Sequence, residues 1–358
     1  MSLILTFLGK GGSGRSTVAI AAAKKLADRG ARVLLIGQDP GPAWAMPLGV
    51  SPTDSVAEIA PNLSIVQLNS TRLLERSWEE VKDLEKQYLR SPTLKNVYGQ
   101  ELGILPGMDG ALALNALREY NKSGKYDVIV YDGTGDLNTL RMFAIPEVGS
   151  WYLRRFRQVF TDSDIGRTLS PFVQPIAGAI LNVSWNPDDL AKNAGSNILE
   201  EGRQALSNPS RMIAYLVTDD TPISIATAQY LWGGAQQIGL NVGGVIFNRS
   251  SATDDFSPLP VSVLPTVIHG DWSSVFSELP DFLDAPEPPK PLIIDTAARQ
   301  VKVFLPGFEK KQVKLTQSGP ELTIDAGDQR RNIDVPPPLA GQPVKGAKFH
   351  EGYLIISF

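Results

Sequence analysis

A glycine-rich stretch directly after an apolar run constrains the fold of this chain more than any other feature. Residues 3–8 read LILTFL, residues 9–17 read GKGGSGRST, and a helix-forming stretch follows over 16–29. A short apolar run bounded by glycines is typical of a strand buried on both faces. A strand, a glycine-rich loop and a helix together form a cradle in which backbone amides surround phosphate oxygens. The stretch therefore predicts a phosphate-binding α/β fold.

The same alternation of apolar runs and helical stretches continues to about residue 284. Uninterrupted apolar runs predict buried strands at 3–8, 33–37, 64–68, 103–105, 128–131, 212–218 and 242–247. Helices are expected over 16–29, 71–90 and 109–121, and an insertion at about 138–210 carries helices over 138–160, 164–183 and 187–208. This pattern predicts an α/β fold with a doubly wound, mostly parallel sheet and a helical insertion.

A proline-rich stretch precedes a different pattern near the C-terminal end of the sequence. Residues 283–291 read LDAPEPPKP, and we expect an extended linker over 285–291. From 292 to 358 apolar and polar residues alternate in short runs, with glycine and proline turns between them. Alternation with period two predicts half-buried antiparallel strands. We therefore expect a phosphate-loop domain over 1–284 and an antiparallel β-sandwich over 292–358.

Composition excludes several classes of protein. The chain has no cysteine and only two histidines, which excludes disulfides, thiolate zinc sites and iron–sulfur clusters. A net charge of −4 does not favour nucleic acid as a partner. No apolar run approaches the roughly 20 residues that span a bilayer, and no basic segment precedes the first one. We expect a cytoplasmic protein without zinc, nucleic-acid partner or stable membrane insertion.

The glycine-rich stretch has the spacing of a phosphate loop, with arginine where a lysine usually stands. The hydroxyl of Ser16 is placed to bind Mg²⁺. The predicted nucleotide-binding residues of the loop are Gly9, Gly11, Gly12, Ser13, Gly14, Arg15, Ser16 and Thr17. The alternative interpretation is a tight strand-to-helix turn that binds no ligand.

Two aspartates follow buried strands and are the main acidic candidates. Asp39 stands just beyond the run at 33–37, and Asp132 ends the run at 128–131. The carboxyl ends of parallel strands form the ligand-facing edge of such a sheet. We expect Asp39 to orient an attacking water and Asp132 to hold Mg²⁺ through water. Each could instead cap a turn.

The order of these motifs resembles the arsenite-pump (ArsA) and guided-entry (GET) tail-anchored-protein targeting ATPase family. The likeness covers residues 1 to about 284 and rests on GKGG, Asp39-Pro40, Pro106-Gly107-Met108-Asp109, YDVIVYD and Thr139-Leu140-Arg141. The tail, with VFLPGFEKKQVKL and EGYLIISF, resembles a small heat-shock, α-crystallin-type domain. The two together are similar to the branch of photosynthetic organisms in which such a domain is fused behind the ATPase.

The resemblance implies a homodimer that binds ATP and Mg²⁺ and hydrolyses ATP. Lys10 would reach across the dimer to the partner's phosphates, so the predicted catalytic residues are Lys10, Arg15 and Asp39. Asn248, in VIFNR, and Pro265 would lie against the adenine base. The alternative for Lys10 is a solvated surface lysine.

In targeting members of that family the helical insertion shelters a transmembrane segment. The predicted client groove consists of two helical faces: Tyr152, Phe156, Val159 and Phe160, and Leu169, Phe172, Val173 and Ile176. The alternatives are that these residues pack the core of the insertion, or that WYLRRFRQVF is a basic helix on a membrane surface.

Three departures from the family pattern bear on function. Arg15 replaces the usual lysine, DGTGDLNT lacks a histidine, and no cysteine can form a zinc clasp or bind arsenite. Because arginine is bulkier and planar, slow hydrolysis is expected. The leading hypothesis is an ATP-driven dimeric targeting factor. The alternatives are a nucleotide-gated scaffold with little turnover and a partition or membrane-patterning ATPase.

Overall fold

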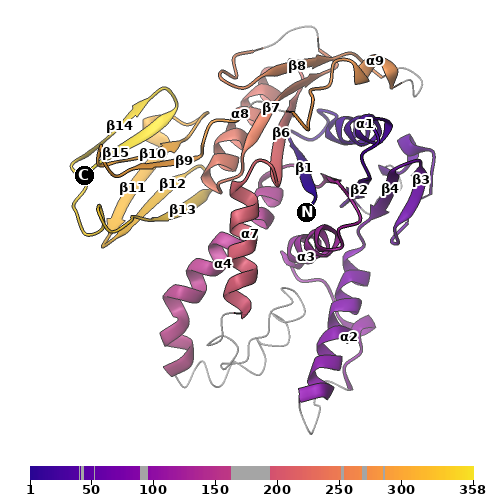
Figure 1. Ribbon diagram of the computed structural model, residues 1–358, viewed down its shortest axis with the longest axis horizontal. Helices are drawn as coiled ribbons and strands as arrows, with labels where there is room; N and C mark the ends of the chain where they lie inside the picture. The colour runs from indigo at the N-terminus through magenta and orange to yellow at the C-terminus, as the bar shows by residue number, and fades with distance from the viewer. Residues whose placement is uncertain are drawn as a thin grey trace.

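A computed structural model describes residues 1–39, 41, 44–51, 53–88, 96–162, 194–250, 254–267, 272–284 and 287–358. Its centre is an eight-stranded sheet in the order β3-β4-β2-β5-β1-β6-β7-β8 (Figure 1). The strands are β1 Leu3–Leu8, β2 Val33–Gly37, β3 Ala57–Ala60, β4 Leu63–Gln67, β5 Val128–Asp132, β6 Met212–Thr218, β7 Val242–Asn248 and β8 Val261–Leu264. Only β3 and β4 pair antiparallel, so the sheet is mostly parallel, as expected.

Helices cover both faces of this sheet, which explains the uninterrupted apolar runs of its central strands. One core contains α1 (Arg15–Asp28) and the short α9 (Ser273–Phe276). The core on the other face contains α3 (Met108–Lys122) and α8 (Pro222–Gln237). The first part of α2 (Ser70–Tyr88) packs on α3. The chain therefore has the doubly wound α/β architecture that the sequence predicts.

One predicted strand is wrong, and two strands were not predicted. Residues 103–105 form no strand, and Ile104 and Leu105 are 37% and 56% exposed. Pro106 and Gly107 follow directly, and Gly107, at φ 89°, starts α3, so the run is too short to reach the sheet. The unpredicted strands, β3 and β8, lie at the two edges of the sheet. Edge strands are half exposed and have no long apolar run to reveal them.

The described part of the helical insertion consists of two long helices. α4 runs over Leu137–Asp162 with Pro146 in its interior, and α7 runs over Ala194–Ser207 and packs against α4. The predicted helix over 138–160 is confirmed. The predicted helix over 164–183 and the start of the one over 187–208 lie outside the described residues. Within the described ranges, no helix is long and apolar enough to cross a membrane.

The C-terminal region is a β-sandwich of two antiparallel sheets, ordered β14-β15-β10-β9 and β11-β12-β13. The strands are β9 Leu292–Asp295, β10 Gln300–Phe304, β11 Val313–Ser318, β12 Glu321–Ala326, β13 Gln329–Asp334, β14 Gly346–His350 and β15 Tyr353–Ser357. The alternating residues Val301, Val303, Leu322, Ile324 and Ile356 are all buried between the sheets. The period-two pattern therefore identified β10, β11, β12, β13 and β15 and their inward faces. It did not identify β9 and β14, the poorly buried strands at the two edges of the four-stranded sheet.

The sandwich packs closely against α8 of the ATPase-like region (Figure 1). A Cβ on Gly233 would lie 2.4 Å from the ring of Phe308, and one on Gly307 would lie 2.4 Å from the Gln229 carbonyl oxygen. The guanidinium of Arg331 donates to the Gln236 carbonyl oxygen at 3.0 Å, and its partial burial lowers its pKa to about 10. Backbone-to-ring contact of this kind requires glycine, so the sequence of α8 is adapted to the sandwich.

Candidate nucleotide-binding site

The glycine-rich loop, residues 9–14, joins β1 to α1 at the carboxyl edge of the sheet, beside the ends of β5, β6 and β7. Gly12 and Gly14 have φ of 87° and 90°, in the left-handed region that favours glycine. A Cβ on Gly9 would lie 2.0 Å from the Val217 carbonyl oxygen. The loop thus takes a tight path that only glycine allows at these positions.

Two residues at the end of β7 brace the loop from outside. The side-chain amide of Asn248 donates to the Ser13 carbonyl oxygen at 2.9 Å, and Arg249 donates to the Gly12 carbonyl oxygen at 2.7 Å. Asn248 is 3% exposed, and a Cβ on Gly14 would lie 2.0 Å from its Nδ2. These bonds turn the loop carbonyls outward. The predicted contact of Asn248 with adenine stays a prediction, because the described contact of its amide group is with the loop.

The start of α1 is suited to an anion. Gly14 caps the helix with no side-chain hydrogen bond, and its first turn holds no acidic residue. Ser13 is 1% exposed, and its buried hydroxyl has no hydrogen-bond partner. Free amides at a helix start and an orphaned buried hydroxyl both favour a bound group with acceptor oxygens. The loop therefore fits the phosphates of a nucleotide.

Asp132, at the end of β5, is the buried acid of the site. It is 4% exposed, and its Oδ2 accepts a hydrogen bond from Trp44 Nε1 at 2.9 Å. Burial raises the pKa of Asp132, while hydrogen bonds from Ser16 and Trp44 and the charge of Arg15 oppose the rise. A hydroxyl and a carboxylate side by side are the oxygen donors that Mg²⁺ prefers. Ser16 and Asp132 thus fit the predicted metal site.

The guanidinium of Arg15 makes its hydrogen bonds to the segment that follows β5. Its NH1 donates to the carbonyl oxygens of Gly133, at 3.4 Å, and of Thr134. Burial lowers the pKa of Arg15, and the charges of Asp132 and Asp136 oppose this. Arg15 therefore ties the start of α1 to the segment that follows β5 and leads into α4.

Asp39 and Lys10 are both exposed at the same edge of the sheet. The Asp39 carboxylate accepts the Gly41 amide at 2.7 Å, and the buried Gln67 side chain donates to the carbonyl oxygens of Asp39, at 2.5 Å, and Gly41, at 2.9 Å. Lys10 Nζ donates to the Gly11 carbonyl oxygen at 3.3 Å. Pro265 follows β8 and is exposed. Lys10 and Asp39 can therefore meet water or a second molecule.

Sequence patterns did not single out Trp44, Gln67 or Arg249. Trp44 is 4% exposed, and its ring lies where a Cβ on Gly37 would be, at 2.3 Å. One sequence signal could have pointed to Trp44. It is a tryptophan in a glycine- and proline-rich stretch, and the strand before it ends in glycine. The side chains of Gln67 and Arg249 bond to backbone carbonyl oxygens of residues that are distant in sequence. No motif spacing predicts such contacts.

The predicted client groove is only partly covered by the described residues. Tyr152 is 54% exposed on α4, and Phe156, Val159 and Phe160 lie in the same helix. The second predicted face, Leu169, Phe172, Val173 and Ile176, lies outside the described residues.

The fold and the loop define a P-loop ATPase of the doubly wound class. Residues 2–258 match the family model of the anion-transporting ATPases, and the chain belongs to this family. Residues 297–358 match the HSP20-like domain found in ArsA. The resemblance noted from the motifs is thereby confirmed, and the domain boundaries at residues 284, 285 and 292 stay predictions.

Curated relatives agree with this assignment. A Chlorobaculum tepidum protein named as an arsenical pump-driving ATPase is 25% identical over 99% of this chain and 95% of its own length. One from Aquifex aeolicus with a similar name is 22% identical over 99% of both chains. The protein named ATPase GET3 from Mycosarcoma maydis is 26% identical over 51% of this chain and 52% of its own.

Proposed function

We propose that this chain is a cytoplasmic, Mg²⁺-dependent ATPase that works as a homodimer and shelters hydrophobic segments of membrane proteins. The observation that carries the nucleotide part is the convergence of the glycine-rich loop, Ser16 and Asp132 at one edge of the sheet, with Lys10 and Asp39 exposed beside them. The client part rests on the family likeness and on the helical insertion.

Each residue of the site has a role that follows from its position. The amides at the loop and at the start of α1 receive phosphate oxygens, and Ser16 and Asp132 hold the metal ion. Mg²⁺ in that position neutralises charge on the phosphates. Asp39, which is exposed, orients the attacking water. Lys10 extends from one protomer toward the phosphates in its partner, which makes hydrolysis dependent on the dimer.

Few residues separate the candidate nucleotide site from the helix that carries the proposed client surface. α4 begins at Leu137, five residues beyond Asp132, and the intervening segment includes the carbonyls that Arg15 holds. Further along α4, Val148 and Tyr152 stand one turn apart and are 42% and 54% exposed. Nucleotide-dependent movement of the segment 133–136 therefore displaces the helix that presents these apolar side chains.

Co-expression with a tail-anchored membrane protein tests the client role. The wild type should be recovered in a complex that depends on ATP, and the double variant V148S/Y152S should lose most of it. Leu283→Ser is the matched control, because Leu283 is 53% exposed and lies outside the insertion. Equal recovery of the client with wild type, double variant and control, or with and without nucleotide, would refute the sheltering role.

A second candidate is a nucleotide-gated binding protein with little turnover, and the position of Arg15 favours it. The guanidinium is already bonded to the carbonyl oxygens of Gly133 and Thr134. Losing one aimed electrostatic contact costs about 10²–10³ in rate. Steady-state phosphate release separates the two: turnover abolished by Lys10→Ala and by Asp39→Asn supports the enzyme, and tight ATP binding without product supports the gated binder.

A further inference from the structure

A cavity of about 540 Å³ lies at the opposite edge of the sheet from the glycine-rich loop. Residues of α3, α4 and α7 line it, together with residues at the amino ends of β1 and β6. Figure 1 shows these three helices around the N-terminal end of β1. The volume falls within the roughly 300–1,000 Å³ of small-molecule sites. The cavity contains none of the predicted nucleotide or client residues.

The walls of the cavity are mainly apolar. Ile4 of β1, Leu114 of α3, Phe143 of α4, Leu199 of α7 and Met212 of β6 all line it. Such walls do not hold ordered water well, because water needs two to four polar partners. An apolar group of a ligand is therefore the better occupant of the space.

Arg118 and Arg211 line the same cavity, together with Lys122 and Glu201, which pair with each other at 3.6 Å. Arg118 NH2 donates to Asn115 Oδ1 at 2.8 Å, but its Nε is shut off from solvent without a hydrogen-bond partner. Over the described ranges, neither Arg118 nor Arg211 forms an ion pair with a carboxylate. A buried donor without an acceptor is costly, and a carboxylate satisfies a guanidinium better than any neutral group.

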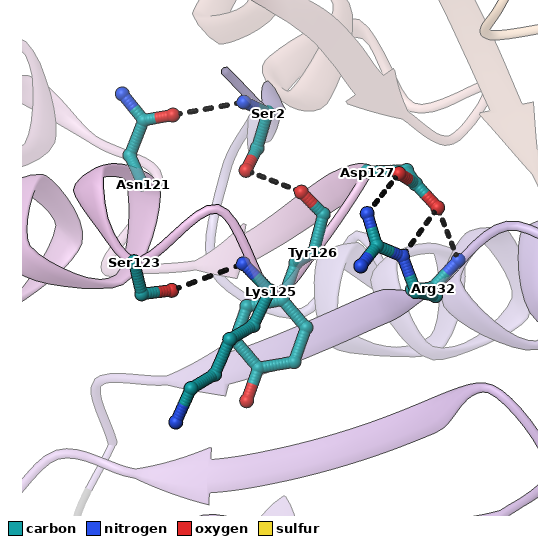
Figure 2. Close-up of polar contacts among 7 residues, drawn as sticks. All are labelled: Ser2, Arg32, Asn121, Ser123, Lys125, Tyr126 and Asp127. Carbon is teal, nitrogen blue, oxygen red and sulfur yellow. Dashed lines mark hydrogen bonds and ion pairs between the residues drawn. The ribbon is translucent and has the colours of Figure 1, made fainter.

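The frame around the cavity is held by contacts between elements that are distant in sequence. Ser2 N donates to Asn121 Oδ1 at 2.9 Å, and Ser2 Oγ donates to the Tyr126 carbonyl oxygen at 2.7 Å (Figure 2). Lys122 of α3 pairs with Glu201 of α7 at 3.6 Å. These contacts join the start of β1 to the end of α3, and α3 to α7. The cavity is therefore preformed, which lowers the entropic cost of binding.

We propose that this cavity binds a fatty carboxylate, whose headgroup bonds to Arg118 and whose chain lies along the apolar walls. The combination of an apolar cavity and a guanidinium whose buried Nε has no acceptor carries the assignment. Arg211 adds a second positive charge to the lining, which favours an anion over a neutral or cationic amphiphile.

Calorimetric titration of the full chain with dodecanoate, below its micellar concentration, tests the proposal. We expect one saturable site per chain. Arg118→Gln should weaken it at least tenfold, and Ala205→Phe, which fills the cavity without changing charge, should abolish it. Lys125→Gln is the matched control. Lys125 lies near Ser2 and Tyr126 at the same edge (Figure 2) but is not among the residues that line the cavity, and its loss should leave affinity within twofold.

Two further probes test the contributions of the charged headgroup and of the alkyl chain separately. Dodecyltrimethylammonium has the same chain and the opposite charge, and inorganic phosphate has charge without a chain. The proposal requires that both bind at least tenfold more weakly than dodecanoate. It is overturned if dodecanoate shows no saturable binding, if either probe binds as well, or if Arg118→Gln binds like the wild type. Thermal unfolding of each variant shows whether a lost signal reflects a lost fold, and Ala205→Phe then serves as the second variant.

Discussion

Trp44 Nε1 donates a hydrogen bond to Asp132 Oδ2 across 2.9 Å, between a loop after β2 and the end of β5. Both side chains are 4% exposed. The bond fixes the Asp132 carboxylate and opposes the rise that burial causes in its pKa. An indole donor thus favours the ionised form of Asp132, which is the form that binds a metal ion.

Trp44→Phe should shift the acid limit of Mg²⁺-dependent nucleotide binding to higher pH. Burial already raises the pKa of Asp132, so binding falls as the pH drops through that raised value. Loss of the Trp44 hydrogen bond, which favours the carboxylate form, raises the pKa further. The measurement is nucleotide affinity against pH with and without Mg²⁺. Trp272→Phe, which is distant from Asp132, is the control, and identical profiles for all three proteins would contradict the role of Trp44.

Arg15→Lys should raise the rate of ATP hydrolysis at least tenfold. Lysine lacks the planar guanidinium that bonds to the carbonyl oxygens of Gly133 and Thr134, so these oxygens are released. Its ammonium group instead places a compact charge near the loop. Steady-state phosphate release with saturating ATP measures the change. A fall in the rate to the level of Arg15→Ala would show instead that the guanidinium itself is used in turnover.

Gly14→Ala should abolish nucleotide binding, because its φ is 90° and the new Cβ would lie 2.0 Å from Asn248 Nδ2. Gly30→Ala is the control, since Gly30 lies outside the loop and also has φ 90°, but a Cβ there meets nothing within 4 Å. Equilibrium binding of a fluorescent ATP analogue distinguishes them. Similar losses in both variants would mean that the bracing by Asn248 does not shape the loop.

Gly307→Ala should loosen the sandwich from α8. Gly307 has φ 74° and faces the Gln229 carbonyl oxygen, whereas Gly319 has φ 59° and faces open space. Both substitutions strain the backbone alike, so the difference between them isolates the docking contact. We expect Gly307→Ala to be destabilised by at least about 1 kcal/mol more, since a collision adds to the strain. Thermal unfolding and the rate of proteolysis at the linker measure this, and equal values would refute it.

Sequence reasoning predicted which edge of the sheet carries the candidate nucleotide site. The order of GKGGSGRST, Asp39 and Asp132 along the chain placed them at one edge, because parallel strands all end there. The same reasoning missed Trp44 and Arg249. Their side chains act across the site on Asp132 and Gly12, and such contacts depend on how loops fold over the strand ends.

The sequence by itself determined the fold class, the family and the glycine-rich loop, because hydrophobic period, glycine spacing and strand-terminal acids are local properties. The tertiary structure alone decided the direction of Arg15, the docking of the sandwich on α8 and the arginine-lined cavity at the far edge of the sheet. Each of these depends on side chains from elements distant in sequence, whose packing no local pattern records.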